Sequence, residues 1–368
     1  MLKLMLRQLV HHPVRMFLSV LMISVALLLG LVIKGLATGV MEEKIHRTEG
    51  IGADLMIQPP HSSYILGLGE NVMPDSMAQK ILEVKGIAAT TPTATNVSFT
   101  NRFEAVFGID LPSFNRVTGG FEYLQGGPFA GPYTALVDDV YVGTHHVHLG
   151  SILDILNHRF TICGVVEHGK GARVFIPLKT LQDLVAPGKC SVIFVKCTSP
   201  ALDSVVQKRL RELDGGALSG YQITKMSDLT SLITTSSFLG LKQFLLVVVA
   251  FAGVINFLVI FLALYVQMLA QTREIGILRA LGASRRYMLN LFLGEACLLC
   301  LIGGALSLLL YLLTKTIVLS IYPALNFLLP AGSVLRVAVI ALASAVLGGA
   351  YPAYRASACE PIVALAYE

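Results

Sequence analysis

Long apolar stretches constrain the fold of this chain more than any other feature of its sequence. Residues 16–33 carry no charge, and with their flanks they reach the roughly 20 residues that an α-helix needs to cross the hydrocarbon core of a bilayer. Three more apolar runs follow at residues 238–270, 287–320 and 334–354. We therefore expect an α-helical membrane protein with four transmembrane helices.

The composition agrees with a chain that lies largely in lipid. Of its 368 residues 54% are hydrophobic and only 14% are charged, which is too apolar for a soluble protein of this length. Residues 42–236 differ, because their composition is that of an ordinary soluble domain. We expect three parts: residues 1–38 with an amphipathic helix and the first span, residues 39–236 as an extracytoplasmic domain, and residues 237–368 with spans two to four.

The first apolar run also has features of a cleaved signal peptide. A basic lead precedes it, and small residues follow it near Gly35. The run is long for the hydrophobic part of a signal peptide, and the basic lead is extended. We therefore favour a transmembrane helix preceded by a basic amphipathic stretch that suits an anionic membrane surface.

Basic residues in the short connecting segments indicate the orientation of the spans. The N-terminal lead has three of them, whereas residues 321–333, between spans three and four, carry no charge. The link between spans two and three contains Arg273, Arg279, Arg285 and Arg286. Because Lys and Arg concentrate in cytoplasmic loops, this link and both termini should lie in the cytoplasm. Residues 42–236 then form an outer domain inserted between the first and second spans.

The outer domain has the pattern of short strands mixed with a few helices. Strands are predicted at residues 104–109, 134–137, 160–166, 173–176 and 191–197, several of them ending at Gly or Pro. Helices are predicted at residues 74–85, where Met77, Ile81 and Leu82 share a face, and at residues 201–213, where Val205, Val206 and Leu210 share a face. This mixture predicts an α+β domain.

Several functions find no support in the residues. The net charge is +5, but Lys and Arg flank apolar runs instead of forming a stripe with aromatic residues, so nucleic acid is not an expected partner. The chain has no Gly-x-x-x-x-Gly-Lys-Ser/Thr run for nucleotide phosphates and no Gly-x-Ser-x-Gly turn for a catalytic serine. The histidines of residues 145–148 lack spaced Cys or carboxylate partners. We expect no catalytic residue, cofactor or metal in this chain.

The C-terminal third resembles the FtsX-like permease domains. The resemblance rests on residues 273–286, Arg-Glu-Ile-Gly-Ile-Leu-Arg-Ala-Leu-Gly-Ala-Ser-Arg-Arg, followed by an apolar span with Glu295 and the pair Gly303 and Gly304. A second match lies at Tyr351-Pro-Ala-Tyr-Arg-Ala356 and Glu360-Pro-Ile-Val-Ala-Leu365.

The outer domain resembles the MacB-like periplasmic core domain. The matching pieces are Gly52-Ala-Asp-Leu-Met-Ile57, Phe107-Gly-Ile-Asp110, and Phe160-Thr-Ile-Cys-Gly-Val-Val166 leading to Phe175-Ile-Pro-Leu178. The chain departs from the family at Gly150-Ser151, where Gly-Asp is frequent. Nearly the whole chain is thus similar to the MacB/FtsX-like, LolC/LolE-related ABC transporter permeases, a mechanotransmission family.

The resemblance implies a non-enzymatic permease of the bacterial inner membrane. Such a subunit pairs with a second permease, as a homodimer or a heterodimer, and with two copies of a cytoplasmic ATPase that binds ATP and magnesium. A periplasmic adaptor or an outer-membrane channel joins some family members. The implied activity is export or extraction of a hydrophobic or amphipathic cargo, such as a lipoprotein, lipid, peptide or drug. The alternative is an FtsX-like regulator that transmits motion to a cell-wall hydrolase, and the length of residues 42–236 favours the MacB type.

The segment at residues 272–286 is the expected contact with the ATPase. Its apolar face carries Ile275, Leu278 and Leu281. Its polar face carries Arg273, Glu274, Arg279 and Arg285, and Arg286 follows. Gly282 suits the end of this helix. The residues alone leave open an interfacial loop whose arginines only satisfy the positive-inside rule.

Polar and small residues inside the spans form a second candidate set. Glu295 lies within span three, and we favour a structural contact with Asn256 or Gln267 of span two over a proton relay. Gly303 and Gly304 of span three, with Gly348 and Gly349 of span four, should let helices pack closely.

Three cysteines lie in the outer domain. In an oxidising compartment, two of Cys163, Cys190 and Cys197 are expected to pair in a disulfide, because all three lie in or beside predicted strands.

Overall fold

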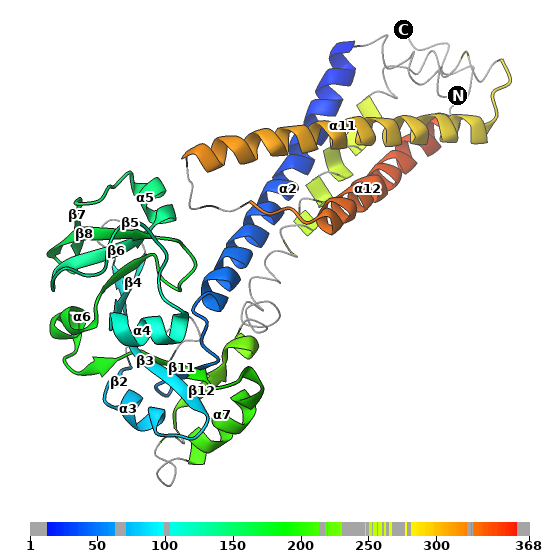
Figure 1. The fold of residues 1–368 in the computed structure, drawn as a ribbon. Coiled ribbons are helices and arrows are strands. Elements are labelled where there is room, and N and C mark those ends of the chain that lie inside the picture. The colour runs from blue at the N-terminus through cyan, green and yellow to red at the C-terminus, as the bar shows by residue number, and fades with distance from the viewer. Residues whose placement is uncertain are drawn as a thin grey trace. The chain divides into compact units, whose positions relative to one another are not determined.

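The computed structural model describes residues 13–62, 71–98, 104–212, 218, 220–229, 281–321, 325, 327–358 and isolated positions between 247 and 277. The chain divides into two compact units. The membrane unit comprises residues 1–40, 239–320 and 325–368, and the outer unit comprises residues 41–238 and 321–324. Figure 1 shows long helices in the first unit and a sheet with short helices in the second.

A mixed sheet of 10 strands organises the outer unit. Its order is β12 (Gln222–Lys225), β1 (Leu55–Gln58), β11 (Val192–Cys197), β3 (Ile87–Ser98), β4 (Glu104–Ile109), β9 (Val174–Pro177), β6 (Thr134–Asp138), β8 (His158–Val166) and β5 (Tyr123–Gly126), with β7 (Ile152–Ile155) also on β8. The pairs β4–β9 and β6–β8 are parallel, and the other pairs are antiparallel. A separate small sheet joins β10 (Lys189–Cys190) to β2 (Met73–Pro74).

Short helices lie between the strands. They are α3 (Met77–Leu82), α4 (Leu111–Thr118), α5 (Asp139–His145), α6 (Leu178–Val185), the 3₁₀ turn η1 (Pro200–Leu202) and α7 (Asp203–Glu212). Local chemistry accounts for two of their starts, because Asp110 accepts the Ser113 amide at the start of α4 and Asp138 accepts the Tyr141 amide at the start of α5. The left-handed conformation of Gly119 then ends α4.

The predicted strands and helices of the outer unit are present, but two side chains were assigned to the wrong face. Leu82 is 44% exposed on α3, where Ala78 and Ile81 are buried instead. Val205 is 44% exposed on α7, where Val206 and Leu210 fill the core. Both helices are short, so their orientation depends on neighbouring elements more than on their own periodicity.

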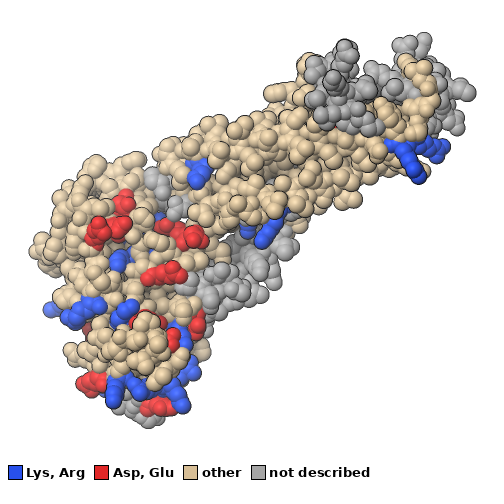
Figure 2. All heavy atoms as spheres, turned by 45° about the vertical axis from the view of Figure 1, so that its right-hand side comes forward, with Lys and Arg blue, Asp and Glu red and all other residues tan. Residues whose placement is uncertain are grey.

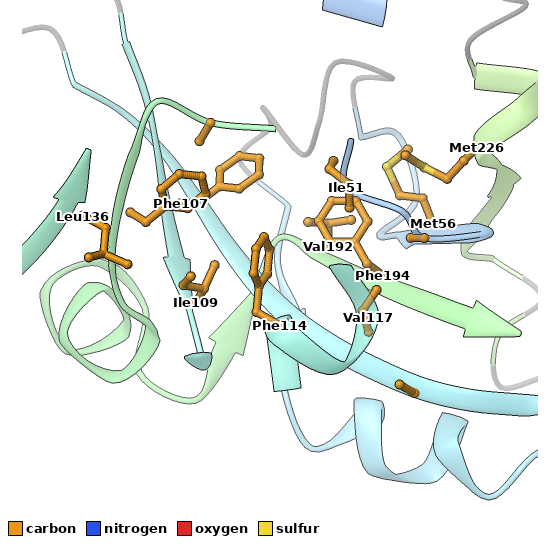
Figure 3. Packing of buried hydrophobic residues seen from close by; sticks show 14 of the residues in the cluster. Ile51, Met56, Phe107, Ile109, Phe114, Val117, Leu136, Val192, Phe194 and Met226 are labelled. Atoms are coloured by element: carbon orange, nitrogen blue, oxygen red, sulfur yellow. The ribbon is translucent and has the colours of Figure 1, made fainter. Parts of the chain in front are cut away.

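Aromatic residues dominate the centre of the outer unit. Phe107 of β4 and Phe175 of β9 meet edge to face with ring centroids 6.2 Å apart, and Phe114 of α4 lies 6.0 Å from Phe175. All three are fully buried. Figure 3 shows Phe107 and Phe114 in the same cluster as Ile51, which lies two residues after the end of the first long helix at Glu49.

Among the residues that the structure describes, three helices are long and apolar enough to cross a bilayer. They are α2 (Pro13–Glu49), α11 (Arg285–Ile321) and α12 (Ala331–Ala358), with candidate spans at Met16–Glu49, Arg285–Ile321 and Val334–Tyr351. The expected span at residues 238–270 lies mostly outside the described residues. On the face in Figure 2, charged side chains gather on the outer unit, while the surface of the long helices is almost uncharged.

Candidate functional site

The expected ATPase-coupling segment lies largely outside the described residues. Its members Arg273, Glu274, Ile275, Leu278 and Arg279 fall there, whereas Leu281, Gly282, Arg285 and Arg286 are described. Leu281 is 80% exposed, and Gly282 has a φ of 95°, a conformation that suits glycine. The Ser284 hydroxyl accepts the Tyr287 amide at 3.2 Å, and α11 begins at Arg285. A left-handed glycine therefore separates the residues before Leu281 from α11.

Glu295 is buried on α11, with 2% of its surface exposed. It belongs to the inward face of this helix, together with Ala296 and Leu299. Asn256 and Gln267, the two contacts expected for it, lie outside the described residues. A carboxyl group at this depth is a costly side chain for a transmembrane helix.

The four glycines expected to pack helices have different surroundings. A Cβ atom at Gly303 would lie 2.7 Å from Cγ2 of Ile23, so this glycine brings α11 directly against α2. Gly304 has open space around the same position, with nothing within 4 Å among the described atoms. Gly348 and Gly349 are both buried in α12.

A packing site between α2, α11 and the connection that leads to α12 was not anticipated. Tyr311 of α11 is 3% exposed and so close to Gly35 that a Cβ there would lie 2.6 Å from the tyrosine hydroxyl. The ring of Phe327 lies 6.4 Å from that of Tyr311, and the Leu328 amide donates to the Gly35 carbonyl at 3.2 Å. The only signal in the sequence was a glycine within an apolar helix.

The last two turns of α2 make polar contacts that sequence reasoning also missed. Glu43 and Arg47 are four residues apart, so they lie on one face of the helix. This face meets residues 167–173, the loop between β8 and β9. Arg173 donates from Nη2 to Oε1 of Glu43 over 3.2 Å, and Arg47 donates from Nη2 to the Gly171 carbonyl over 2.6 Å. Both side chains of the Glu43–Arg173 ion pair are nearly buried, at 12% and 13% exposure.

Glycines allow the helix and the loop to approach closely. A Cβ atom at Gly50 would lie 2.1 Å from the Gly169 carbonyl oxygen, which no side chain tolerates. Gly169 has a φ of 115°, and the imidazole rings of His46 and His168 lie beside it with centroids 6.0 Å apart. The signal available in the sequence was Gly-Lys-Gly at residues 169–171, which alone indicates only a turn.

Asp138 is hydrogen-bonded to the backbone of Arg173 and is 1% exposed. Its amide donates to the Arg173 carbonyl at 3.0 Å, and its Oδ1 accepts the Tyr141 amide at 2.6 Å. Within the described part of the chain, Oδ2 of Asp138 and Nη1 of Arg173 are buried atoms without a hydrogen-bond partner. Burial raises the pKa of Asp138 to about 6, although the positive charges of Arg173 and Arg47 oppose this increase.

The expected disulfide is absent, because Cys163, Cys190 and Cys197 all have free thiols. Cys190 and Cys197 lie at opposite ends of an extended segment, where seven residues span roughly 20 Å. Cys163 lies on β8, five strands away from β11 in the sheet order. A disulfide requires Cα atoms within about 7 Å, so none of the three pairs can form in this fold.

These features define a membrane protein with several apolar helices and a separate outer domain built on a mixed sheet. Residues 16–213 match the family described as the MacB-like periplasmic core domain, and residues 246–361 match the FtsX-like permease C-terminal family. The first match covers more than half of the chain. The chain therefore belongs to the MacB/FtsX-like family of ABC transporter permeases.

Individual relatives match parts of the chain. The "Macrolide export ATP-binding/permease protein MacB" of Syntrophobacter fumaroxidans is 30% identical over 199 residues, which are 51% of this chain and 26% of that protein. The "Uncharacterized ABC transporter permease YvrN" of Bacillus subtilis is 38% identical over 98 residues, 27% of this chain and 24% of that protein. The chain thus spans about a quarter of the length of these relatives.

The periplasmic region of MacB from Actinobacillus actinomycetemcomitans shares 17% identity, with a TM-score of 0.38, over 51% of this chain and 96% of that structure.

Proposed function

We propose that this permease converts ATP hydrolysis by a separate cytoplasmic ATPase into movement of its outer domain. The observation that supports the proposal is the continuity of α2, which runs unbroken for 37 residues. At about 1.5 Å per residue it is roughly 55 Å long, whereas the hydrocarbon core of a bilayer is about 30 Å thick. One continuous helix therefore includes residues of both units, so displacement of the span would be passed along the same helix to the outer domain.

The proposed work is export or extraction of a hydrophobic or amphipathic cargo: a lipoprotein, lipid, peptide or drug. The names of the matched MacB proteins refer to macrolide export, which supports transport. An FtsX-like regulator of a cell-wall hydrolase is not favoured by these relatives.

The proposed arrangement has four spans in the bacterial inner membrane, with both termini and residues 273–286 in the cytoplasm. Two permease subunits, identical or different, would bind two ATPase subunits, which hold the ATP and magnesium. The outer domain, inserted between the first and second spans, would be available to a periplasmic adaptor or an outer-membrane channel. The distribution of basic residues supports this topology.

The test concerns the proposed contact with the ATPase at residues 272–286. Leu278→Asp, on the apolar face, and charge reversal at Arg279 or Arg285 should abolish co-purification with the ATPase or stimulation of ATP hydrolysis in proteoliposomes. Arg211→Glu is the matched control, because it reverses an exposed charge on α7 of the outer unit. Normal coupling in all three variants, at normal expression, would show that the ATPase binds elsewhere.

A further inference from the structure

We propose that the loop of residues 167–173 is the joint through which α2 moves the outer domain, and that Arg173 is its positioning residue. This inference rests on the proposed function and names the residues that would transmit the motion. We call these seven residues, Glu-His-Gly-Lys-Gly-Ala-Arg, the joint loop.

One face at the end of α2, continued by Gly50, contacts four residues of the joint loop. Glu43, His46, Arg47 and Gly50 follow the spacing of a single helical face, at steps of three, one and three residues. The face contacts Arg173 by an ion pair, Gly171 by a hydrogen bond, His168 by ring contact and Gly169 by close backbone approach. A helix held at successive turns cannot rotate about its axis without breaking several of these contacts together.

The other side of the joint loop is attached to helices of the outer unit. Lys170 donates from Nζ to the Thr118 carbonyl at the last residue of α4, over 2.7 Å. His168 lies 3.0 Å from Oδ1 of Asp139, the first residue of α5, through both its amide and its Nδ1. Motion of the loop would therefore displace α4 and α5.

The joint loop also leads directly into the central strands. It connects β8 to β9, and the Arg173 carbonyl accepts the amide of Asp138 at the end of β6. Gly171 has a φ of 87°, and a Cβ there would lie 2.9 Å from the ring of Phe107 and 3.1 Å from Ile51. The loop is consequently supported by the buried aromatic cluster, which gives it little freedom to yield when α2 moves.

Arg173 holds the two sides of the joint together. Its Nη2 reaches Glu43 on α2, while its own carbonyl is bonded to β6. The ion pair is nearly buried, so replacing Arg173 by a neutral residue removes a charged partner of Glu43 in a poorly hydrated place. Lysine keeps the charge but cannot reproduce the fork of guanidinium donors.

The experiment uses the full chain with its ATPase in lipid nanodiscs, followed by hydrogen–deuterium exchange. Without nucleotide, Arg173→Gln should raise amide exchange in residues 41–49 and 167–173 by at least about tenfold. With magnesium ATP and vanadate, the unmodified chain should show altered exchange in β8 and β9. This response should be lost in Arg173→Gln, although the ATPase still hydrolyses ATP.

Matched variants separate positioning from folding. Arg159→Gln removes an exposed charge on β8 and should keep the full response. Arg173→Lys should retain part of it, and the charge exchange Glu43→Arg with Arg173→Glu should restore part of what Arg173→Glu alone removes. If Arg173→Gln fails to fold, Glu43→Gln breaks the same ion pair from the helix side.

The outcomes distinguish the two proposals. A full nucleotide response in folded Arg173→Gln, or unchanged exchange at the joint, would overturn the joint while leaving ATP-driven motion intact. No nucleotide response in the unmodified chain would overturn the proposed function, and the joint with it.

Discussion

Gly303 of α11 faces Ile23 of α2 so closely that a Cβ atom at residue 303 would lie 2.7 Å from the Ile23 side chain. Ile23 is 1% exposed and cannot easily move away. The neighbouring Gly304 has no atom within 4 Å of the same position among the described residues. Two adjacent glycines thus supply a matched pair for testing helix packing.

Gly303→Leu should separate α2 from α11 and lower the free energy of unfolding by about 1–3 kcal/mol, because overpacking forces displaced side chains. Gly304→Leu adds the same volume where there is room and should leave the unfolding midpoint nearly unchanged. Thermal unfolding in detergent would measure both. Equal losses in the two variants would mean that the leucine itself, rather than the contact with Ile23, destabilises the helix.

Asp138 should make stability depend on pH. Burial raises its pKa to about 6 in the folded chain, above the ordinary value of 3.8, so the folded state binds the proton more tightly. The stabilisation from this proton is complete below about pH 4 and is lost as the pH rises to about 6. Asp138→Asn keeps an oxygen acceptor for the Tyr141 amide but carries no charge.

This variant should therefore be more stable than the unmodified chain at pH 7.5, by on the order of 1 kcal/mol, with a flatter profile between pH 4 and 6. Thermal unfolding across this range is the measurement. Asp154→Asn, at an exposed position of β7, is the control. Its stability should change with pH in the same way as that of the unmodified chain. If the stability of Asp138→Asn also changed with pH as that of the unmodified chain does, the prediction would be contradicted.

The outer cysteines should differ in reactivity. Burial raises the pKa of Cys190 to about 12 and that of Cys197 to about 11, whereas Cys163 is partly exposed. At pH 7.5 a maleimide should label Cys163 first, and the other two should react only after denaturation. Mass spectrometry of peptides from unreduced protein would measure this, and a peptide pair joined by a disulfide between any two of them would contradict the fold.

The proposed topology can be tested at Lys208, an exposed residue of α7. Lys208→Cys, with Cys163 replaced by serine, should react with a membrane-impermeant maleimide in intact cells whose outer membrane is permeable to the reagent. A cysteine at Arg286 should react only after the cells are opened. Protection of residue 208 in intact cells would rule out an external outer domain.

Part of the local structure could be predicted from patterns of neighbouring residues. The strand predicted at residues 160–166 is β8, and the helix predicted at residues 201–213 is α7, because both have clear apolar periodicity. The exposure of the Val205 side chain could not be predicted, because it depends on which elements pack against α7. The prediction of a disulfide between two outer-domain cysteines was wrong, because predicted strands do not specify how far apart they lie in the sheet.

The sequence by itself determined the long apolar spans and the soluble outer domain, because the energetic cost of placing charge in lipid depends on composition over about 20 residues. Its motifs also indicated the family. Only the tertiary structure placed Arg173 against Glu43, which lies 130 residues earlier in the chain. Such a contact is decided by how the sheet orders its strands and where α2 ends, and no local pattern of residues carries that information.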